Sequence, residues 1–111
     1  MAPGSRKDLG AFYVSLTKTK KIIICESAID AISYYALNSN FIAISTSGIN
    51  SNPVWLPKLF NKGFKIYCGY DSDSSGNEAA SKMINLYPEI KRKKAEKKDW
   101  NEVLQSTFIA Y

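Results

Sequence analysis

The chain has 111 residues, of which 45% are hydrophobic and 23% charged, a balance typical of one globular domain. It contains no histidine, which excludes Ser-His-Asp and Cys-His catalytic systems. Its two cysteines, Cys25 and Cys68, are too few for a zinc site, and we expect them to be buried free thiols. No apolar run is long enough to cross a bilayer, so we expect a cytoplasmic protein without a membrane contact.

Positive charge is concentrated in one segment. Six basic residues and one acidic residue lie between Lys91 and Lys98, and the rest of the chain carries nine of each sign, so this segment accounts for the net charge of +5. Such a run can bind phosphate groups, or it can be a solvated linker. The residues that we assign to nucleic-acid binding are Lys91, Arg92, Lys93, Lys94, Lys97 and Lys98.

The chain begins with a lead-in over residues 1–10, and a single domain then spans 11–111. Residues 11–16 predict a strand at a sheet edge. The run of β-branched residues over 21–25 predicts a strand that is covered on both faces.

A helix is predicted over residues 27–37. A capping box from Ser27 to Asp30 marks its start. Three apolar residues at helical spacing are expected on its buried face: Ile29, Ile32 and Ala36.

The remainder of the chain alternates between strands and helices. The predicted strands are 41–45, followed by a turn at Ser47-Gly48, then 64–70 and a short last strand at 88–91. The predicted helices are one opening at Asn52-Pro53 and carrying Val54, Leu56, Leu59 and Phe60, one over 77–86, and one over 100–108 capped by Asp99. Trp55 and Trp100 are expected to be packing residues. The alternation predicts an α/β fold with a largely parallel sheet of about four strands and helices on both faces.

Acidic side chains follow two strands of the predicted sheet. Glu26 comes directly after 21–25, and Asp71 and Asp73 come after 64–70. Because ligands of open parallel sheets bind at the carboxyl ends of the strands, we expect these carboxylates to share one site. Residues i and i+2 at a strand end point the same way, so Asp71 and Asp73 can face one ion. A hard, oxygen-liganded cation such as Mg²⁺ is the metal that this residue supply favours.

Each acidic residue also has a simpler interpretation. Asp71 and Asp73 lie in Asp-Ser-Asp-Ser-Ser-Gly, a sequence that forms turns readily. Asp30 and Asp99 both begin or complete capping boxes of predicted helices. Glu26 at the end of a second strand is what raises the specificity of the pattern.

Two segments carry a family resemblance: Glu26-Ser27-Ala28-Ile29-Asp30-Ala31 and Asp71-Ser72-Asp73-Ser74-Ser75-Gly76. They resemble the two motifs of the TOPRIM domain, which primases, type IA and type II topoisomerases and several nucleases share. Residues 98–104 and the Ser47-Gly48 turn resemble a subgroup in mobile-element primase-like or relaxase-associated proteins. The resemblance covers residues 11–108 and implies a Rossmann-like TOPRIM fold. The family's first motif usually has glycine where this chain has Ser27.

The resemblance implies roles for the acidic residues. Glu26 would be a general base in nucleotidyl transfer or a general acid in strand cleavage. Asp71 and Asp73 would hold Mg²⁺ or Mn²⁺. Residues supporting the site or lying at its periphery would be Asp30, Asp99 and Asn101.

The implied function is metal-dependent nucleotidyl or phosphoryl transfer in a DNA-processing protein, with a primase-like role in DNA replication of a mobile element. Two alternatives stay open: a TOPRIM-type nuclease, and a non-catalytic nucleic-acid-binding module of a larger protein. The partners would be DNA or RNA, together with further domains of a longer chain or a helicase or relaxase. Because the sequence has no topoisomerase tyrosine domain and no primase zinc-binding domain, activity would need such partners.

Overall fold

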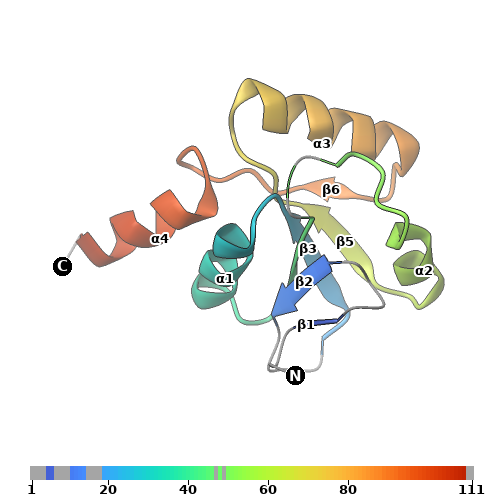
Figure 1. Cartoon of the computed structure of the whole chain (residues 1–111), viewed down its shortest axis with the longest axis horizontal. Coiled ribbons are helices and arrows are strands. Elements are labelled where there is room, and N and C mark those ends of the chain that lie inside the picture. The colour runs from blue at the N-terminus through green and yellow to red at the C-terminus, as the bar shows by residue number, and fades with distance from the viewer. Residues whose placement is uncertain (1–4, 7–10, 15–18, 47, 49, 110–111) are drawn as a thin grey trace.

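Strand β3 (Lys21–Cys25) lies at the centre of the sheet in the computed structural model of this chain (Figure 1). Strands β4 (Ile42–Ser45) and β5 (Lys65–Cys68) run parallel to β3, one on each side of it. Four of the five residues of β3 are buried, as its continuous apolar sequence predicts. The structure describes residues 5–6, 11–14, 19–46, 48 and 50–109.

Three further strands complete a six-stranded sheet with the order β1-β2-β4-β3-β5-β6. Strand β6 (Lys91–Arg92) is parallel to β5, whereas β2 (Ala11–Val14) is antiparallel to β4. Strand β1 (Ser5–Arg6) pairs with β2 and takes the edge position expected for 11–16, of which residues 15 and 16 lie outside the described ranges. The largely parallel α/β sheet is confirmed. The expected sheet of about four strands corresponds to the parallel strands β4, β3, β5 and β6, and antiparallel pairing adds β2 and, from the segment expected to be a lead-in, β1.

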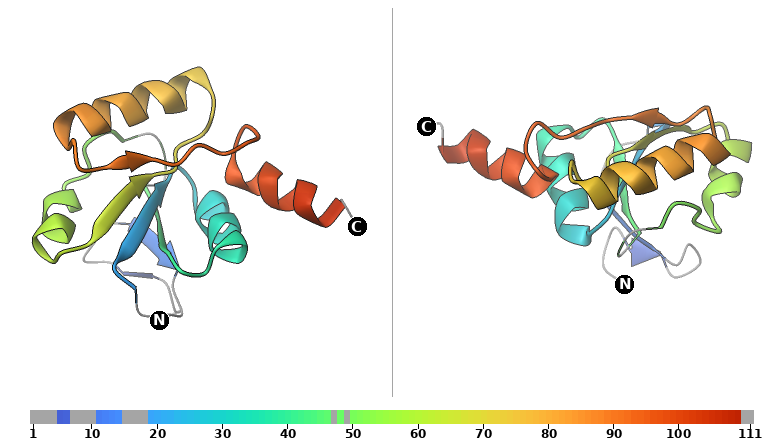
Figure 2. Two further views of the ribbon diagram at one scale, coloured as in Figure 1. Left: turned by 180° about the vertical axis from the view of Figure 1, so that it is seen from behind. Right: turned by 90° about the horizontal axis from the view of Figure 1, so that it is seen from above.

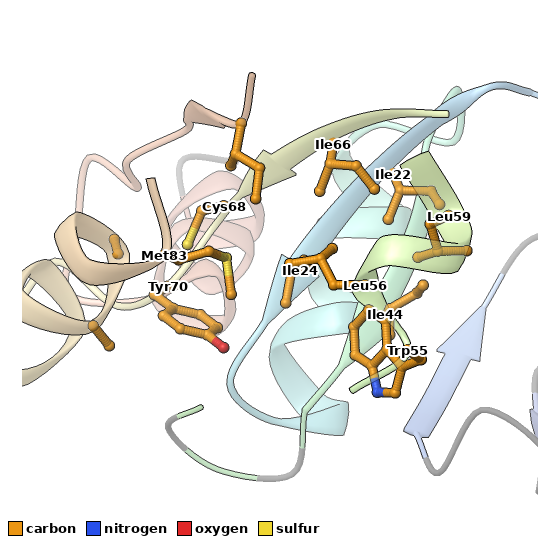
Figure 3. Close-up of a cluster of buried hydrophobic side chains, with 13 residues drawn as sticks. Ile22, Ile24, Ile44, Trp55, Leu56, Leu59, Ile66, Cys68, Tyr70 and Met83 are labelled. Carbon is orange, nitrogen blue, oxygen red and sulfur yellow. The ribbon is translucent and has the colours of Figure 1, made fainter. Parts of the chain in front are cut away.

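A hydrophobic cluster covers each face of the sheet. On one face, Ile22 and Ile24 of β3 join residues of α2 (Leu56–Asn61) and α3 (Ser74–Leu86), as Figure 3 shows. On the other face, the intervening Ile23 belongs to a cluster with residues of α1 (Ala28–Leu37). The expected helices on both faces are therefore confirmed. Helix α4 (Trp100–Ile109) lies beside α1 and extends away from the sheet (Figure 2).

The buried face of α1 differs from the expected one. The three residues expected inside are exposed: Ile29 (63%), Ile32 (50%) and Ala36. Ala31 and Tyr34 are buried instead, together with the polar Asp30 and Ser33. The prediction was wrong because α4 covers this polar side of α1, where Asp30 and Ser33 each form a hydrogen bond with Asn101.

Helix α2 begins later than expected. Its first residue is Leu56 rather than Asn52, so Val54, which was expected on the helix, precedes it and is 91% exposed. Pro57 lies in the first turn of the helix, where the N–H that proline lacks has no intrahelical partner to lose.

Helix α3 begins earlier than expected, at Ser74 rather than at Asn77. Its N-cap is Asp73, whose Oδ1 accepts a hydrogen bond from the Gly76 N–H at 2.7 Å. The carboxylate therefore caps the helix directly before Ser-Ser-Gly, which forms the first turn of α3.

Three smaller expectations are also resolved. Both cysteines are buried and free, and Trp55 is buried in the first cluster. The Trp100 ring packs against the Tyr34 ring with the centroids 4.7 Å apart, so it too is a packing residue. Among the described residues, no helix has both the length and the apolar character needed to span a membrane.

Gly76 provides a test of how tightly the loop before α3 is packed. A Cβ atom at this position would meet the carbonyl oxygen of Asp71 and come within 2.9 Å of its carbonyl carbon. Alanine normally stabilises a helix by about 1 kcal/mol relative to glycine. We nevertheless expect Gly76→Ala to lower the free energy of unfolding by about 1–3 kcal/mol, because backbone atoms must move apart. Urea unfolding measures this, with Ser75→Ala as the exposed control, and a stabilised Gly76→Ala variant would contradict it.

Candidate metal centre

Glu26 and Asp71 meet at the carboxyl end of the parallel strands. Glu26 follows β3 directly, and its Oε1 accepts a hydrogen bond from the Asp71 N–H at 3.1 Å. The Gly69 N–H, which follows β5, donates to the Ile24 carbonyl oxygen at 2.8 Å and so continues the pairing of the two strands. The glutamate side chain thus holds the backbone of the loop that follows β5, and the two sequence motifs lie against each other.

Three carboxylates gather at this junction. One oxygen each from Asp30, Asp71 and Asp99 lies within 4.8 Å of the other two. Asp30 comes from the first turn of α1, Asp71 from the loop after β5, and Asp99 from the residue before α4. Asp30 is buried, and the other two are half-buried. A set of hard oxygen ligands of this kind fits a divalent cation.

Asp71 has the surroundings least favourable to a negative charge. Its Oδ1 is buried and has no hydrogen-bond partner in the described part of the chain. Burial, followed by the charges of Glu26, Asp30, Asp99 and Asp73, raises the pKa of Asp71 to about 7. A buried carboxylate oxygen that accepts no hydrogen bond is unfavourable, and other carboxylates nearby increase the cost. A bound cation would give this oxygen the partner that it lacks. The residues present therefore fit a metal ion.

Burial also raises the pKa of Glu26 and the pKa of Asp30. In each case a backbone N–H partly offsets the effect of burial by donating a hydrogen bond to the carboxylate: that of Asp71 to Glu26, and that of Asn101 to Asp30. The charge of Asp73 raises the pKa of Glu26 as well, which places Asp73 within electrostatic reach of it.

Asp73 and Asp99 occupy positions different from those expected. Asp73 was expected to face the same ion as Asp71, but its Oδ1 caps α3 and it is not among the three close carboxylates. Asp99 was expected at the periphery, yet it lies beside Asp71. A carboxylate has several acceptor positions, so the helix cap of Asp73 leaves room for a further ligand. The assignment of Asp71 and Asp73 to the metal stays a prediction.

The first residues of α4 connect the acidic cluster to α1. Asp99 caps α4, because its Oδ1 accepts a hydrogen bond from the Glu102 N–H at 2.9 Å. The Asn101 N–H donates to Asp30 Oδ1, and Asn101 Oδ1 accepts from the Ser33 hydroxyl, both at 3.3 Å. Asn101 thus holds α4 against α1 and orients Asp30, and its supporting role in the site stays a prediction.

The loop after β4 lies against the same junction, and sequence reasoning missed the residue that holds it. Tyr70 is fully buried, and its hydroxyl donates to the carbonyl oxygen of Asn50. The Gly48 N–H donates to the Glu26 carbonyl oxygen at 2.7 Å, and its φ of 133° is a conformation that favours glycine. Ser47, the other residue of the expected turn, lies outside the described residues. A tyrosine after an apolar strand gives no sequence signal of this role, because it is indistinguishable from an ordinary core residue.

Within the basic segment, Arg92 is engaged by the protein itself. Its guanidinium donates hydrogen bonds at the end of β5 and in the loop beyond it, to the carbonyl oxygens of Cys68, Tyr70 and Asp71 and to Asn77 Oδ1. These contacts hold the loop that carries Asp71 against α3. The guanidinium is therefore committed to internal acceptors rather than presented to a ligand.

The second half of the basic segment lies beside the acidic loop. The Ser72 N–H donates to the Lys98 carbonyl oxygen at 2.6 Å, and the Ser72 hydroxyl donates to the Ala95 carbonyl oxygen at 2.8 Å. Ala95 is buried, whereas three lysines of this stretch are exposed: Lys94, Lys97 and Lys98. Basic and acidic residues of the two segments are thus brought together by backbone contacts.

Comparison with known proteins agrees with this geometry. Residues 23–104 match the family model described as Toprim-like. No curated protein sequence matches the chain.

Solved structures share the fold. A small TOPRIM domain protein from Bacillus stearothermophilus is 21% identical, with a TM-score of 0.62 over 85% of this chain and 87% of that one. The primase fragment of the bacteriophage T7 primase-helicase protein is 18% identical, with a TM-score of 0.63 over 80% of this chain and 40% of the fragment. A chain in the structure of the T7 lagging-strand DNA polymerase with primase domains bound to an RNA/DNA hybrid and dTTP is 19% identical, with a TM-score of 0.59, over 81% of this chain and 50% of that one.

The raised pKa of Asp71 makes stability depend on pH. The pKa of Asp71 rises from 3.8 to about 7 on folding. The contribution of this group to the free energy of unfolding is therefore fully present below pH 3.8 and is lost as the pH rises through about 7. Asp71→Asn has no such loss. In a chelating buffer above about pH 7, we expect its free energy of unfolding to exceed that of the wild type by about 1–2 kcal/mol, after allowance for solvent screening.

The difference between Asp71→Asn and the wild type should disappear towards acid pH. Thermal melts across the pH range measure it, with the exposed Glu96→Gln as a charge-matched control that should melt like the wild type. If Asp71→Asn and the wild type differ in melting temperature by the same amount at acid and at neutral pH, crowding of the carboxylates does not affect stability.

Proposed function

This chain belongs to the Toprim-like family, and we propose that its acidic edge is the metal-dependent centre of a domain that transfers nucleotidyl or phosphoryl groups in DNA processing. The observation that carries the proposal is the gathering of carboxylates from both sequence motifs around Asp71, whose Oδ1 has no partner in the described chain. The likeness of the fold to the T7 primase fragment supports a primase-like reaction over strand cleavage.

Mg²⁺ or Mn²⁺ would be held by Asp71, which is common to both candidate ligand sets. The family motif adds Asp73, and the observed distances add Asp30 and Asp99. When bound, the ion would neutralise the charge that develops on the phosphate oxygens of the substrate.

Glu26 is the residue that we propose moves a proton. Its Oε1 is fixed by the Asp71 N–H, which leaves Oε2 for proton transfer. Burial raises the pKa of Glu26 above its ordinary value, which suits a carboxylate that exchanges protons near neutral pH. Glu26 would take the proton from the attacking hydroxyl in nucleotidyl transfer, or give one to the leaving oxygen in strand cleavage.

A nucleic-acid substrate is compatible with the acidic edge because positive charge lies next to it. The exposed side chains of Lys94, Lys97 and Lys98 belong to the stretch that Ser72 binds. They would hold the phosphate backbone without reading its sequence. Since the chain spans half or less of the two T7 chains, further domains or a helicase or relaxase partner would complete the activity.

Replacement of Glu26 tests the proposed chemistry. We expect Glu26→Gln to lower metal-dependent primer synthesis by about 10²–10⁴-fold, because it removes a general acid or base. Assays of primer synthesis and of nuclease activity, on single-stranded DNA with Mg²⁺ or Mn²⁺ and the partner domains present, measure this. Glu89→Gln, at an exposed position, is the control. Activity confined to cleavage would favour the nuclease, and no activity in either protein would favour the non-catalytic module.

Metal binding can be measured without activity. Titration with Mg²⁺ or Mn²⁺ should raise the melting temperature of the wild type, since the ion binds the native state alone. We expect Asp71→Asn to abolish the rise and Asp99→Asn to reduce it at least as much as Asp73→Asn does. An undiminished rise in Asp71→Asn would remove the proposed centre, and a loss confined to Asp73→Asn would restore the motif pair as the ligands.

A further inference from the structure

A second basic surface lies on the sheet itself and starts at the end of β3 and β5 opposite the acidic edge. Lys21 and Lys65 begin β3 and β5 and are register partners, and Lys91 begins β6 opposite Tyr67. Partners in register point to the same face of a sheet, and alternation along β5 places Lys65 and Tyr67 together. All four side chains therefore share one face, which is the face of Ile23 and α1. Lys21 lies five residues before Glu26, about 16 Å along an extended strand.

Aromatic rings hold two ammonium groups on this face. The Lys21 Nζ lies 4.9 Å from the centroid of the Phe41 ring. The Lys93 Nζ lies 5.5 Å from the same centroid and 5.6 Å from that of Tyr67. The two rings contact each other edge to face, with 5.3 Å between centroids. We call the surface formed by Lys21, Lys65, Lys91 and Lys93 around Phe41 and Tyr67 the lysine–aromatic face.

The positive charge of this face is not neutralised by ion pairs. The ion pair found among the described residues joins Lys82 and Glu78 on α3, and neither residue belongs to this face. The exposed Glu89 lines a hollow of about 220 Å³ together with Lys65 and Lys91 but forms no ion pair with them in the described structure. Like charges directly opposite each other on adjacent strands destabilise a sheet. A bound polyanion would relieve that repulsion.

Protection of a sheet edge does not account for these lysines. A lysine on an exposed edge strand prevents pairing with another chain, and this explains Lys91 on β6. It does not explain Lys21 and Lys65, because β3 and β5 each have a neighbour on both sides. On this face α1 packs against β2, β3 and β4. Lys65 and Lys91, towards β5 and β6, are exposed.

We propose that the lysine–aromatic face binds the phosphate backbone of a nucleic-acid strand, as a contact separate from the acidic edge. Clustered ammonium groups that contact the phosphates are an element with which proteins bind single-stranded nucleic acid without sequence preference. Here the buried Phe41 ring and the half-buried Tyr67 ring position two of those groups. The inference rests on the proposed function, because the lysine–aromatic face would be a second binding site for the same nucleic-acid strand. It requires neither a metal ion nor Glu26.

Binding of a fluorescently labelled oligothymidylate in a chelating buffer tests the face in the absence of metal. We expect Lys21→Gln/Lys65→Gln/Lys91→Gln to bind about tenfold more weakly than the wild type at low salt, and the salt slope of log affinity to fall by about 2, since each lost phosphate contact removes about 0.7. Lys65→Gln/Lys91→Gln changes only exposed side chains and should lose about two thirds as much of the slope, about 1.4.

The matched control removes the same charge elsewhere. Lys58→Gln/Lys62→Gln/Lys82→Gln changes three exposed lysines of α2, its C-cap and α3, and should keep the affinity within about twofold. An equal loss in this control would show that net charge alone binds the oligonucleotide and would overturn the proposal. So would the absence of wild-type binding at low salt. Competition by polyglutamate as strong as that by unlabelled oligothymidylate would show that the face receives an acidic protein instead.

The same measurements separate this inference from the proposed function. Glu26→Gln should bind oligothymidylate like the wild type, because it lies at the other end of the strands. If the triple variant binds normally while activity still depends on Glu26, the lysine–aromatic face is wrong and the catalytic centre stands. If the triple variant loses binding while no activity depends on Glu26, the face stands without the centre.

Discussion

Repulsion among carboxylates around Asp71 is the constraint on which the arrangement at the end of the sheet depends. Left to themselves, like charges this close would move apart. They are kept together by backbone N–H groups that donate to two of the carboxylates, from Asp71 to Glu26 and from Asn101 to Asp30. The Arg92 guanidinium adds hydrogen bonds to carbonyl oxygens beyond β5. The stability lost at this end has to be supplied by the two hydrophobic clusters on β3. A site that is unfavourable without a cation is thereby held ready for one.

The two ends of the parallel strands carry opposite charge. Carboxylates lie where β3 and β5 end, and lysines lie where the same strands begin. A polyanion is repelled by the first end unless a cation is bound there, and is attracted by the second whether or not a cation is present. The loop containing Lys97 and Lys98 approaches the acidic end through Ser72 and reduces the repulsion there. The two proposals thus place chemistry at one end of the parallel strands and a contact with the polymer at the other.

Local patterns predicted the framework and failed where distant segments meet. The bounds of β3 follow from five residues of sequence, since an apolar β-branched run has few alternatives to a buried strand. The buried face of α1 was wrong because Asp30 and Ser33 are buried by Asn101, 68 or more residues further along the chain. Hydrophobic periodicity cannot reveal a polar residue that is buried with its hydrogen-bond partner. Because the polar Asp30 and Ser33 lie on the buried side of α1, Ile29 and Ile32 are left exposed.

Local apolar patterns were enough to predict that acidic side chains follow two parallel strands, because such patterns give the ends of the strands and their order along the chain. The sequence also supplied the residue types that bind a hard cation. Only the tertiary structure decided which carboxylates share the site: Asp99 joins Asp71 because α4 packs on α1, while Asp73 is partly used as the cap of α3. It likewise divided one basic run, turning Arg92 inward and Lys91 onto the sheet face. The position of a charged side chain depends on the hydrogen-bond acceptors and aromatic rings that other segments bring next to it. The residues adjacent to it in the sequence do not reveal those partners.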